Sequence, residues 1–216
     1  MTKETAHQIG TPLSALIGWV ELLKNENKHT TDITATAKAI QEIEKDVQRL
    51  QYITERFSKI DSEPELSYQD IIEATKNSIE YLKPRISPKI HFQFESNKEK
   101  ILIPLNVTLY GWAIENILKN SVDAMKNKGI IDITITDKKD KVEIDIKDEG
   151  KGMHPSKLRK IFEAGYSTKK RGWGYGLSFT KRIIEEYHPK GKIFIAYSGK
   201  INGTITKIIF QLDSEI

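Results

Sequence analysis

The sequence contains no cysteine, which excludes disulfide bonds, thiolate metal sites and cysteine nucleophiles. Histidine is scarce too, and the spacing of the five histidines matches no metal site. No apolar run approaches the roughly 20 residues that cross a bilayer, and the N-terminus lacks the apolar core of a signal peptide. We therefore expect a soluble chain of a reducing compartment, the cytoplasm, that makes no membrane contact of its own.

Neither sign of charge is in large excess. The 34 Lys and Arg against 30 Asp and Glu leave a formal net charge of +4, and the charges are interspersed except at Lys169-Lys170-Arg171. A basic stripe with interleaved aromatic residues is absent, so we expect no nucleic-acid partner. With 216 residues, 38% of them hydrophobic, the chain can form one large domain or two small ones. A functional-looking helix directly after Met1 suggests a piece of a longer protein, whose remainder could carry a sensor or a membrane anchor.

The first 60 residues follow the periodicity of two helices. Each has apolar side chains at alternating steps of four and three, which places them on one stripe. The stripe comprises Ile9, Leu13, Leu16, Val20 and Leu23 in the first helix. In the second it comprises Ile33, Thr36, Ile40, Ile43, Val47, Leu50, Thr54 and Phe57, of which six are apolar. Because a two-helix hairpin alone buries little, we predict a homodimer in which two hairpins form a four-helix bundle. Packing of the hairpin on the rest of its own chain is the alternative.

His7 lies off the apolar stripe of the first helix. The residues that follow on its face are all small: Gly10, Thr11, Ser14 and Gly18. A second protein surface could therefore approach the imidazole. Pro12 has no amide hydrogen for the Gln8 carbonyl, which predicts a bend one turn after His7. Taken alone, the segment also fits an exposed histidine on a surface helix.

A short polar segment ending at Pro64 separates these helices from a different pattern, so we predict two domains, residues 1–60 and 61–216. In the second domain helices are predicted over residues 71–82, 105–126 and 177–187. Strands are predicted over residues 90–94, 101–103, 131–135, 142–146, 192–197 and 204–212, with a hairpin between the third and fourth. The fold class is therefore α+β: a helical hairpin followed by an α/β sandwich with a mixed sheet.

Asn116 and Asn120 lie four residues apart on the helix of residues 105–126, so both side chains project from one face. An amide oxygen is a hard ligand suited to magnesium, which takes phosphate oxygens and water at its other positions. Polar pairs at this spacing more often mark a solvated helix face.

Asp148 follows directly on a predicted strand and precedes Gly150 and Gly152. A carboxylate can accept a hydrogen bond from the amino group of adenine, and glycines let the backbone approach the base. An ordinary turn with glycine at positive φ explains the same residues equally well. Thr204, at the start of the final strand, could support Asp148 at the adenine or simply begin that strand.

The segment with Gly172, Gly174, Gly176 and Leu177 opens a helix, whose free amides and positive end suit phosphates. It lacks the Gly-Lys-Ser/Thr ending of a Walker loop and does not follow a strand, as a dinucleotide fingerprint would.

Residues 164–171, between the two glycine-rich segments, are basic and without periodicity, which predicts a mobile lid. We assign Thr168 and Lys169 to the nucleotide, Lys169 as a phosphate contact. Lys170 and Arg171 are better explained as solvated charges.

In this order, the motifs resemble those of the sensor histidine kinases of two-component signalling, over nearly the whole chain. Residues 7–13 resemble the phosphoacceptor box of the dimerisation and histidine-phosphotransfer hairpin. Residues 116–120 resemble the asparagine box, residues 148–152 the first glycine box, Phe162 the phenylalanine box, and residues 172–177 the second glycine box. The resemblance implies a Bergerat-type ATP-binding fold, shared with gyrase B and heat-shock protein 90.

The resemblance also implies a reaction. The neutral imidazole of His7 attacks the γ-phosphorus of ATP, Asn120 holds Mg²⁺, and the phosphoryl group then passes to an aspartate on a response-regulator receiver domain. Thr11 matches the position that orients water for dephosphorylating that regulator. Asn116 stands where the related ATPases usually carry a glutamate that could activate water, so it argues for transfer to a protein residue.

Two residues depart from the family pattern. Gln8 stands where these kinases commonly carry Glu or Asp, and Asp123 where many have a basic residue near the phosphates. Gln8 and Thr11 favour one alternative function, an ATP-gated dimer that acts mainly as a regulator phosphatase or scaffold. A chaperone-like ATPase of the same fold is the other alternative, which Asn116 and the N-terminal hairpin disfavour.

Overall fold

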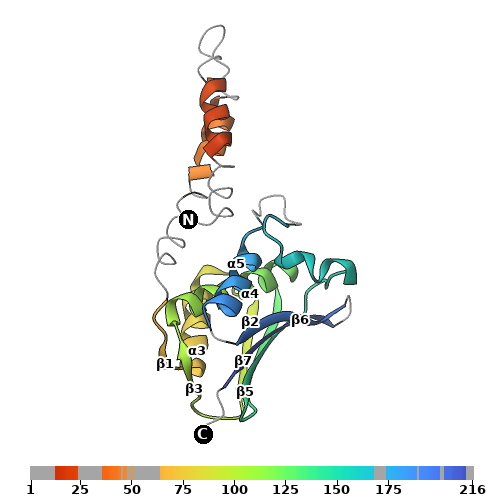
Figure 1. The fold of residues 1–216 in the computed structure, drawn as a ribbon. Coiled ribbons are helices and arrows are strands. Elements are labelled where there is room, and N and C mark those ends of the chain that lie inside the picture. Colours follow the sequence, from red (N-terminus) through yellow and green to blue (C-terminus); the bar gives the residue numbers. More distant parts are fainter. Residues whose placement is uncertain are drawn as a thin grey trace. The chain divides into compact units, whose positions relative to one another are not determined.

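The computed structural model describes residues 13–23, 36–44, 46–47, 50, 64–167, 174–188, 190–199 and 202–212. The chain divides into two compact units, Met1–Pro64 and Glu65–Ile216 (Figure 1). In the first unit the described residues, 13–23 and those between 36 and 50, are helical. Several predicted site residues lie outside the described residues: His7, Gln8, Thr11, Thr168, Lys169 and Gly172.

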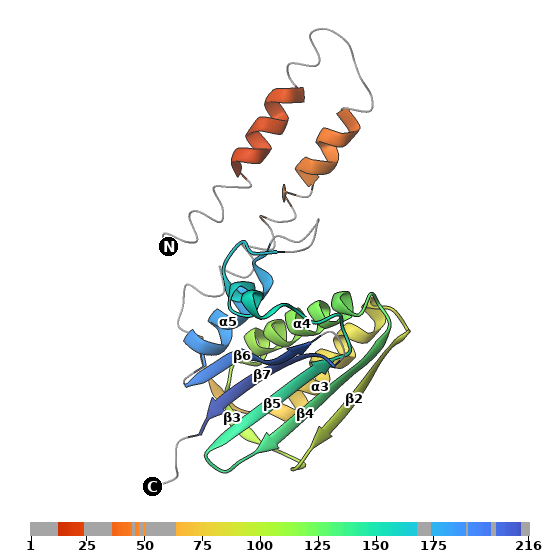
Figure 2. The ribbon, with the colours of Figure 1, turned by 90° about the vertical axis from the view of Figure 1, so that its right-hand side faces the viewer.

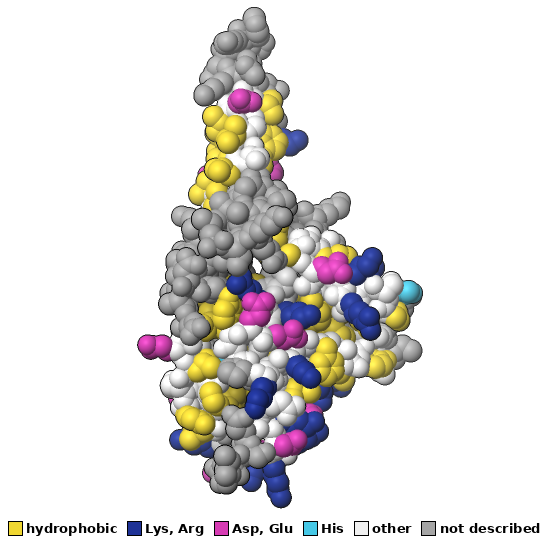
Figure 3. Space-filling model, viewed as in Figure 1, with side chains coloured by type: hydrophobic (Ala, Val, Ile, Leu, Met, Phe, Trp, Pro, Cys, Tyr) yellow, Lys and Arg dark blue, Asp and Glu magenta, His cyan; other side chains and the backbone are white. Residues whose placement is uncertain are grey.

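Much of the predicted apolar stripe of the first unit is open to solvent in the single chain. Leu13 is 48% exposed, Val20 40%, Ile40 47% and Val47 42%. Apolar side chains are prominent on the described part of this unit (Figure 3). Since burying such a side chain contributes about 1.5–3 kcal/mol, these four residues indicate a surface that a partner would cover.

The second unit is built on a mixed five-stranded sheet in the order β2-β4-β5-β7-β6. Its strands are β2 (Ile90–Ser96), β4 (Gly129–Asp137), β5 (Lys141–Asp148), β6 (Gly191–Gly199) and β7 (Gly203–Gln211). β2 runs parallel to β4, and the other neighbouring pairs are antiparallel. The predicted mixed sheet is confirmed.

Helices cover one face of this sheet (Figure 2). They are α3 (Ile71–Leu82), α4 (Val107–Ala124) and α5 (Gly176–Glu186). Strand alternation sends an apolar row to the covered face, where Ile133, Ile144 and Ile146 are at most 1% exposed. The other face carries charged residues that pair across strands, such as Lys207 with Asp145 at 3.1 Å. Basic and acidic side chains are interspersed over the visible surface (Figure 3).

A second, two-stranded sheet was not predicted. β1 (Ser67–Asp70) pairs antiparallel with β3 (Leu102–Leu105). The polar sequence of β1 has no apolar alternation, and its conformation depends on the pairing and on Asp70. The Asp70 carboxylate caps α3 by accepting from Ile72 N–H at 3.1 Å and also accepts from Ile101 N–H at 3.2 Å.

The start of α4 also differs from the prediction, which put it at Leu105. Leu105 pairs with Ser67 in the small sheet, and Asn106 caps the helix by accepting from Leu109 N–H at 3.0 Å. Two 3₁₀ turns, Pro155–Lys157 and Lys160–Phe162, lie between β5 and α5. Within the described ranges, no helix combines the length and apolar character that a membrane crossing requires.

His188 connects the N-cap of α4 with α5 on the helix-covered face of the sheet. It is 1% exposed, its Nδ1–H donates to the Ile183 carbonyl at 2.8 Å, and its Nε2 accepts from Asn106 N–H at 3.2 Å. Its ring meets the Phe210 ring edge-on. Burial lowers the pKa of His188 below its ordinary value, so the ring is neutral in the folded protein.

We predict that acid destabilises the fold through His188. Because the folded pKa is depressed, the free energy of unfolding is unaffected by this residue above its ordinary pKa of 6.5 and falls as the pH drops below that value, by up to about 1.4 kcal/mol per pH unit. Denaturant unfolding between about pH 8 and pH 5, which brackets the ordinary pKa of histidine, measures the slope of the free energy of unfolding against pH. His188→Gln should flatten it, whereas His91→Gln, at an exposed residue of β2, should not. Equal slopes in wild type and His188→Gln would contradict the prediction.

Candidate active site

Asp148 is the last residue of β5 and lies on the helix-covered face, 4% exposed. Its carboxylate accepts from Gly150 N–H at 2.8 Å, from the Ser121 hydroxyl at 3.1 Å, and from the backbone N–H of Thr204. Burial raises the pKa of the Asp148 carboxyl, and the three donors act against that rise. The site therefore holds a fixed, buried hydrogen-bond acceptor.

Glycines let the chain close tightly around this carboxylate. A Cβ on Gly150 would lie 2.6 Å from Asp148 Oδ1, and one on Gly203, at φ +69°, would lie 1.7 Å from the Asp148 carbonyl oxygen. Gly152, at φ +63°, packs in the same way on the Gly199 carbonyl. Positive φ thus explains Gly152, but close approach to Asp148 explains Gly150, so an ordinary turn does not account for the segment.

The face of α4 with the two asparagines reaches the start of α5. Asn116 is 8% exposed, and its amide nitrogen donates to the Gly176 carbonyl at a long 3.5 Å. Asn120, one turn later, and Leu177, next to Gly176, are half-buried. Asn116 and Gly176 of the second glycine-rich segment, 60 residues apart, therefore meet in the fold.

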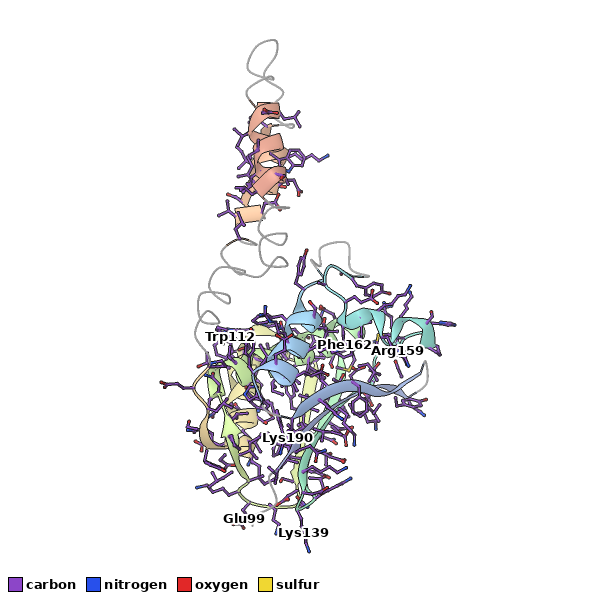
Figure 4. All side chains as sticks on the ribbon, in the orientation of Figure 1. Glu99, Trp112, Lys139, Arg159, Phe162 and Lys190 are labelled. Carbon is purple, nitrogen blue, oxygen red and sulfur yellow. The ribbon has the colours of Figure 1, made fainter. Side chains whose placement is uncertain are left out.

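Two glycines pair across the predicted lid, residues 164–171: Gly165 lies near its start and Gly174 lies three residues after its end. Gly165 N–H donates to the Gly174 carbonyl at 3.2 Å. Both glycines have positive φ, +81° and +74°, and a Cβ on Gly174 would lie 2.4 Å from the Gly165 carbonyl carbon. Phe162 and Arg159 precede this segment, and Lys139 lies at the opposite end of the sheet (Figure 4). The two ends of the lid segment are thus held together.

The start of α5 has the character of an anion site. Its N-cap residue, Tyr175, makes no side-chain capping hydrogen bond. The first-turn amides and the positive end of the helix dipole suit a phosphate oxygen. The second glycine-rich segment leads into this turn, so phosphates bound here would lie near the asparagine face of α4.

Asn116 and Asn120 of α4 offer amide oxygens to a metal. In the described part of the chain, no group of three or more His, Asp or Glu could hold a metal ion. Two amides on one helix face fit Mg²⁺ that takes its remaining ligands from phosphate oxygens and water. Asp123 is exposed at the end of the same helix.

The sequence did not single out three residues that complete this site: Ser121, Ser198 and Gly203. Ser121 donates to a carboxylate 27 residues away. Ser198 accepts from Met153 N–H at 2.8 Å and shares a hydrogen bond of 3.0 Å with the Thr204 hydroxyl. Their partners come from other strands or from the loop after β5, so no local spacing reveals them. Gly203 could have been found, because a glycine directly before a strand residue of interest marks close backbone approach.

Two family models match the chain. Residues 1–63 match the His Kinase A (phospho-acceptor) domain, and residues 107–216 match the histidine kinase-, DNA gyrase B-, and HSP90-like ATPase. The first match includes His7, and the second includes Asn116, Asp148 and the glycine-rich segments.

Similar proteins extend this picture. A putative sensor histidine kinase NtrY-like of Rickettsia conorii is 28% identical over 98% of the chain and 36% of its own length. Sporulation kinase E of Bacillus subtilis is 29% identical over 94% of the chain and 27% of its own length. The crystal structure of histidine kinase ThkA in complex with response regulator protein TrrA matches with a TM-score of 0.68 at 24% identity, over 98% of the chain and 60% of ThkA. The chain thus spans about a third of the length of the curated relatives.

Proposed function

The chain belongs to the two-component sensor histidine kinases, with an ATPase domain of the histidine kinase, DNA gyrase B and HSP90 type, and we propose that it is an ATP-dependent protein-histidine autokinase. One observation carries the proposal. Asp148 and the start of α5, which are far apart in the sequence, both contact the C-terminal half of α4, through Ser121 and Asn116, in a chain whose first 63 residues match a phosphoacceptor domain.

In the proposed site Asp148 accepts a hydrogen bond from the adenine amino group, with Thr204 beside it and the backbone of Gly150 and Gly152 against the base. The start of α5, with Gly176 and Leu177, and the preceding Gly172 and Gly174 bind the phosphates, together with Thr168 and Lys169 of the lid. Asn120 holds Mg²⁺, with Asn116 on the same face. When bound, Mg²⁺ supplies positive charge against the charge that develops on the transferred group.

In the proposed reaction the neutral imidazole of His7 is the nucleophile. A nitrogen–phosphorus bond forms at His7, and the bond between the γ-phosphorus and the bridging oxygen breaks, so ADP leaves with that oxygen. Asn116 supports this outcome because an amide cannot activate water as a carboxylate can, which disfavours hydrolysis relative to transfer.

Incubation with γ-labelled ATP and magnesium tests the proposal. Wild-type protein should become labelled and His7→Gln should not, and the label should be stable in base and lost in acid, as a phosphohistidine is. Steady ATP hydrolysis without labelled protein would contradict the proposal and support the chaperone-like ATPase. Label that persists in His7→Gln would place the acceptor elsewhere.

We propose a response-regulator receiver domain as the acceptor of the phosphoryl group. The support is family membership and the similarity to ThkA, whose structure was solved in complex with a response regulator. An aspartate of that regulator would attack the phosphohistidine, and His7 would regain its lone pair.

We propose that the protein is a homodimer through the first unit, because the apolar stripe described above is solvated in the single chain. Removing residues 1–60 should therefore leave a monomer by light scattering. Ile40→Glu with Val47→Glu in the full chain should give the same result, since charges in a seam oppose pairing. Val107→Glu, at a residue 42% exposed at the start of α4, is the matched control and should stay dimeric. A dimeric remainder, or a monomeric wild type, would count against the four-helix bundle.

A regulator phosphatase or scaffold is the second candidate. The residue after His7 favours it, since Gln8 cannot take a proton as Glu or Asp can, and Thr11 is suited to orienting water. This function predicts loss of phosphate from a phosphorylated regulator in the presence of the protein and ATP, with little label on His7.

A further inference from the structure

Thr204 is the one hydroxyl-bearing residue of the proposed site that lies directly beside Asp148 in the sheet. It pairs with Asp148 in the register of β5 and β7, is 5% exposed, and donates its backbone N–H to the Asp148 carboxylate. A hydroxyl can both donate and accept, so its position alone does not set which it offers to a nucleobase. That choice depends on the hydroxyl's other partner.

The other partner is Ser198 on β6. Ser198 Oγ accepts from Met153 N–H at 2.8 Å and lies 3.0 Å from Thr204 Oγ1. Met153 belongs to the loop after β5, next to Gly152, whose backbone packs on the Gly199 carbonyl. The Ser198 oxygen is thus held between that loop and Thr204, with one lone pair already used by a backbone N–H.

The direction of the hydrogen bond between the two hydroxyls decides where the Thr204 proton points. If Ser198 donates to Thr204, the Ser198 proton lies between the two oxygens, and the Thr204 proton remains for a ligand. If Thr204 donates to Ser198, the Ser198 oxygen accepts twice and its own proton turns away from both partners. The first arrangement uses the two short contacts of Ser198 as one acceptance and one donation.

We propose that Ser198 is a specificity-determining positioning residue: by donating to Thr204 Oγ1 it directs the Thr204 proton to a ring nitrogen beside the amino group of adenine. Asp148 and Thr204 then form an acceptor and a donor side by side. Adenine offers the complementary amino donor and ring-nitrogen acceptor, whereas guanine offers an oxygen acceptor where Asp148 needs a donor. The inference rests on the proposed ATP site.

Analogues of ATP test it. Ser198→Ala should weaken ATP binding roughly 3- to 10-fold, the range expected for one misdirected hydrogen bond. The two ring nitrogens beside the amino group are absent in turn from 1-deaza-ATP and 7-deaza-ATP. One of these analogues should bind wild type more weakly than ATP does. The same analogue should bind Ser198→Ala as tightly as it binds wild type. Ser198→Thr, which keeps the hydroxyl, should behave as wild type.

A merely structural role would give a different pattern in the same titrations. If Ser198 only held the loop, Ser198→Ala would weaken ATP and both analogues by the same factor, which overturns the inference. Unchanged ATP affinity in Ser198→Ala also overturns it, while leaving the ATP site intact. Failure of wild type to bind ATP at all would instead overturn the proposed function, and with it the inference.

Discussion

Asp148→Asn is expected to weaken ATP binding by about 10²-fold, because the substitution replaces one oxygen of a buried acceptor by an amide donor. The carboxylate takes hydrogen bonds from Gly150, Ser121 and Thr204 and still offers acceptor capacity to a base. Because Oδ1 accepts from Gly150 and Oδ2 from Ser121, an asparagine loses one of these acceptors and points its N–H at a neighbouring donor or at the adenine amino group. Two donors face each other in that arrangement, and neither is satisfied.

Isothermal titration with ATP and with its magnesium complex measures this effect. Asp145→Asn is the matched control, since Asp145 lies on the same strand but on the open face, paired with Lys207. It should bind ATP as wild type does. A second variant, Asn120→Ala, should reduce only the magnesium-dependent part of the affinity. Unchanged affinity in both Asp148→Asn and Asn120→Ala would show that the site is assigned wrongly.

ATP affinity should also depend on pH through the protonation of Asp148. Burial raises the pKa of Asp148, so on acidification this carboxyl takes up a proton before an ordinary aspartate does. The protonated acid has lost acceptor capacity, and ATP affinity falls. Asp148→Asn should lack that acid limb.

Gln8→Glu is expected to speed autophosphorylation, by up to the 10²- to 10⁴-fold that general-base help typically provides. As positive charge develops on the His7 ring, the proton on its non-attacking nitrogen must be accepted or hydrogen-bonded. A glutamine carbonyl accepts only the hydrogen bond and fixes the tautomer, so water has to carry the proton away. The increase is smaller where a neighbouring group already accepts the proton.

The initial rate of acid-labile labelling with γ-labelled ATP gives the comparison. Gln41→Glu makes the same charge change at an exposed helical residue of the same unit and should leave the rate unchanged. A rate that stays the same or drops in Gln8→Glu would contradict the proposal that autophosphorylation is slow because Gln8 cannot act as a general base. Gln8 would then be a hydrogen-bonding partner selected for His7, in line with the phosphatase alternative.

Elements and positions with a strong local signal could be predicted from the sequence. Ile71–Leu82 is helical as expected because its apolar period is that of a helix, and the end of a strand at Asp148 could be predicted because two glycines follow this residue. The convergence of Asn116 on Gly176 followed from neither spacing nor period; the resemblance to a family suggested it. Ser121 and Ser198 were missed because their roles exist only once α4 and β6 are packed against the strand that ends at Asp148.

β1 shows the same limit at the level of the fold. Ser67-Tyr68-Gln69-Asp70 has no apolar alternation, and its extended conformation is specified by partners more than 30 residues away. Local propensity therefore could not separate it from the linker before it.

The contacts of α4 with the residues before it determine where the ATPase unit can be separated from the rest of the chain. The family match begins at Val107, but α4 rests on what precedes it: Tyr110 is fully buried and shares a 2.6 Å hydrogen bond with Thr75 of α3. Asn106, the cap of α4, also donates its side-chain amide to the Glu65 carbonyl. A fragment starting at residue 107 would expose that face and leave the main sheet without β2. An autonomous fragment has to include Glu65, more than 40 residues ahead of the family boundary.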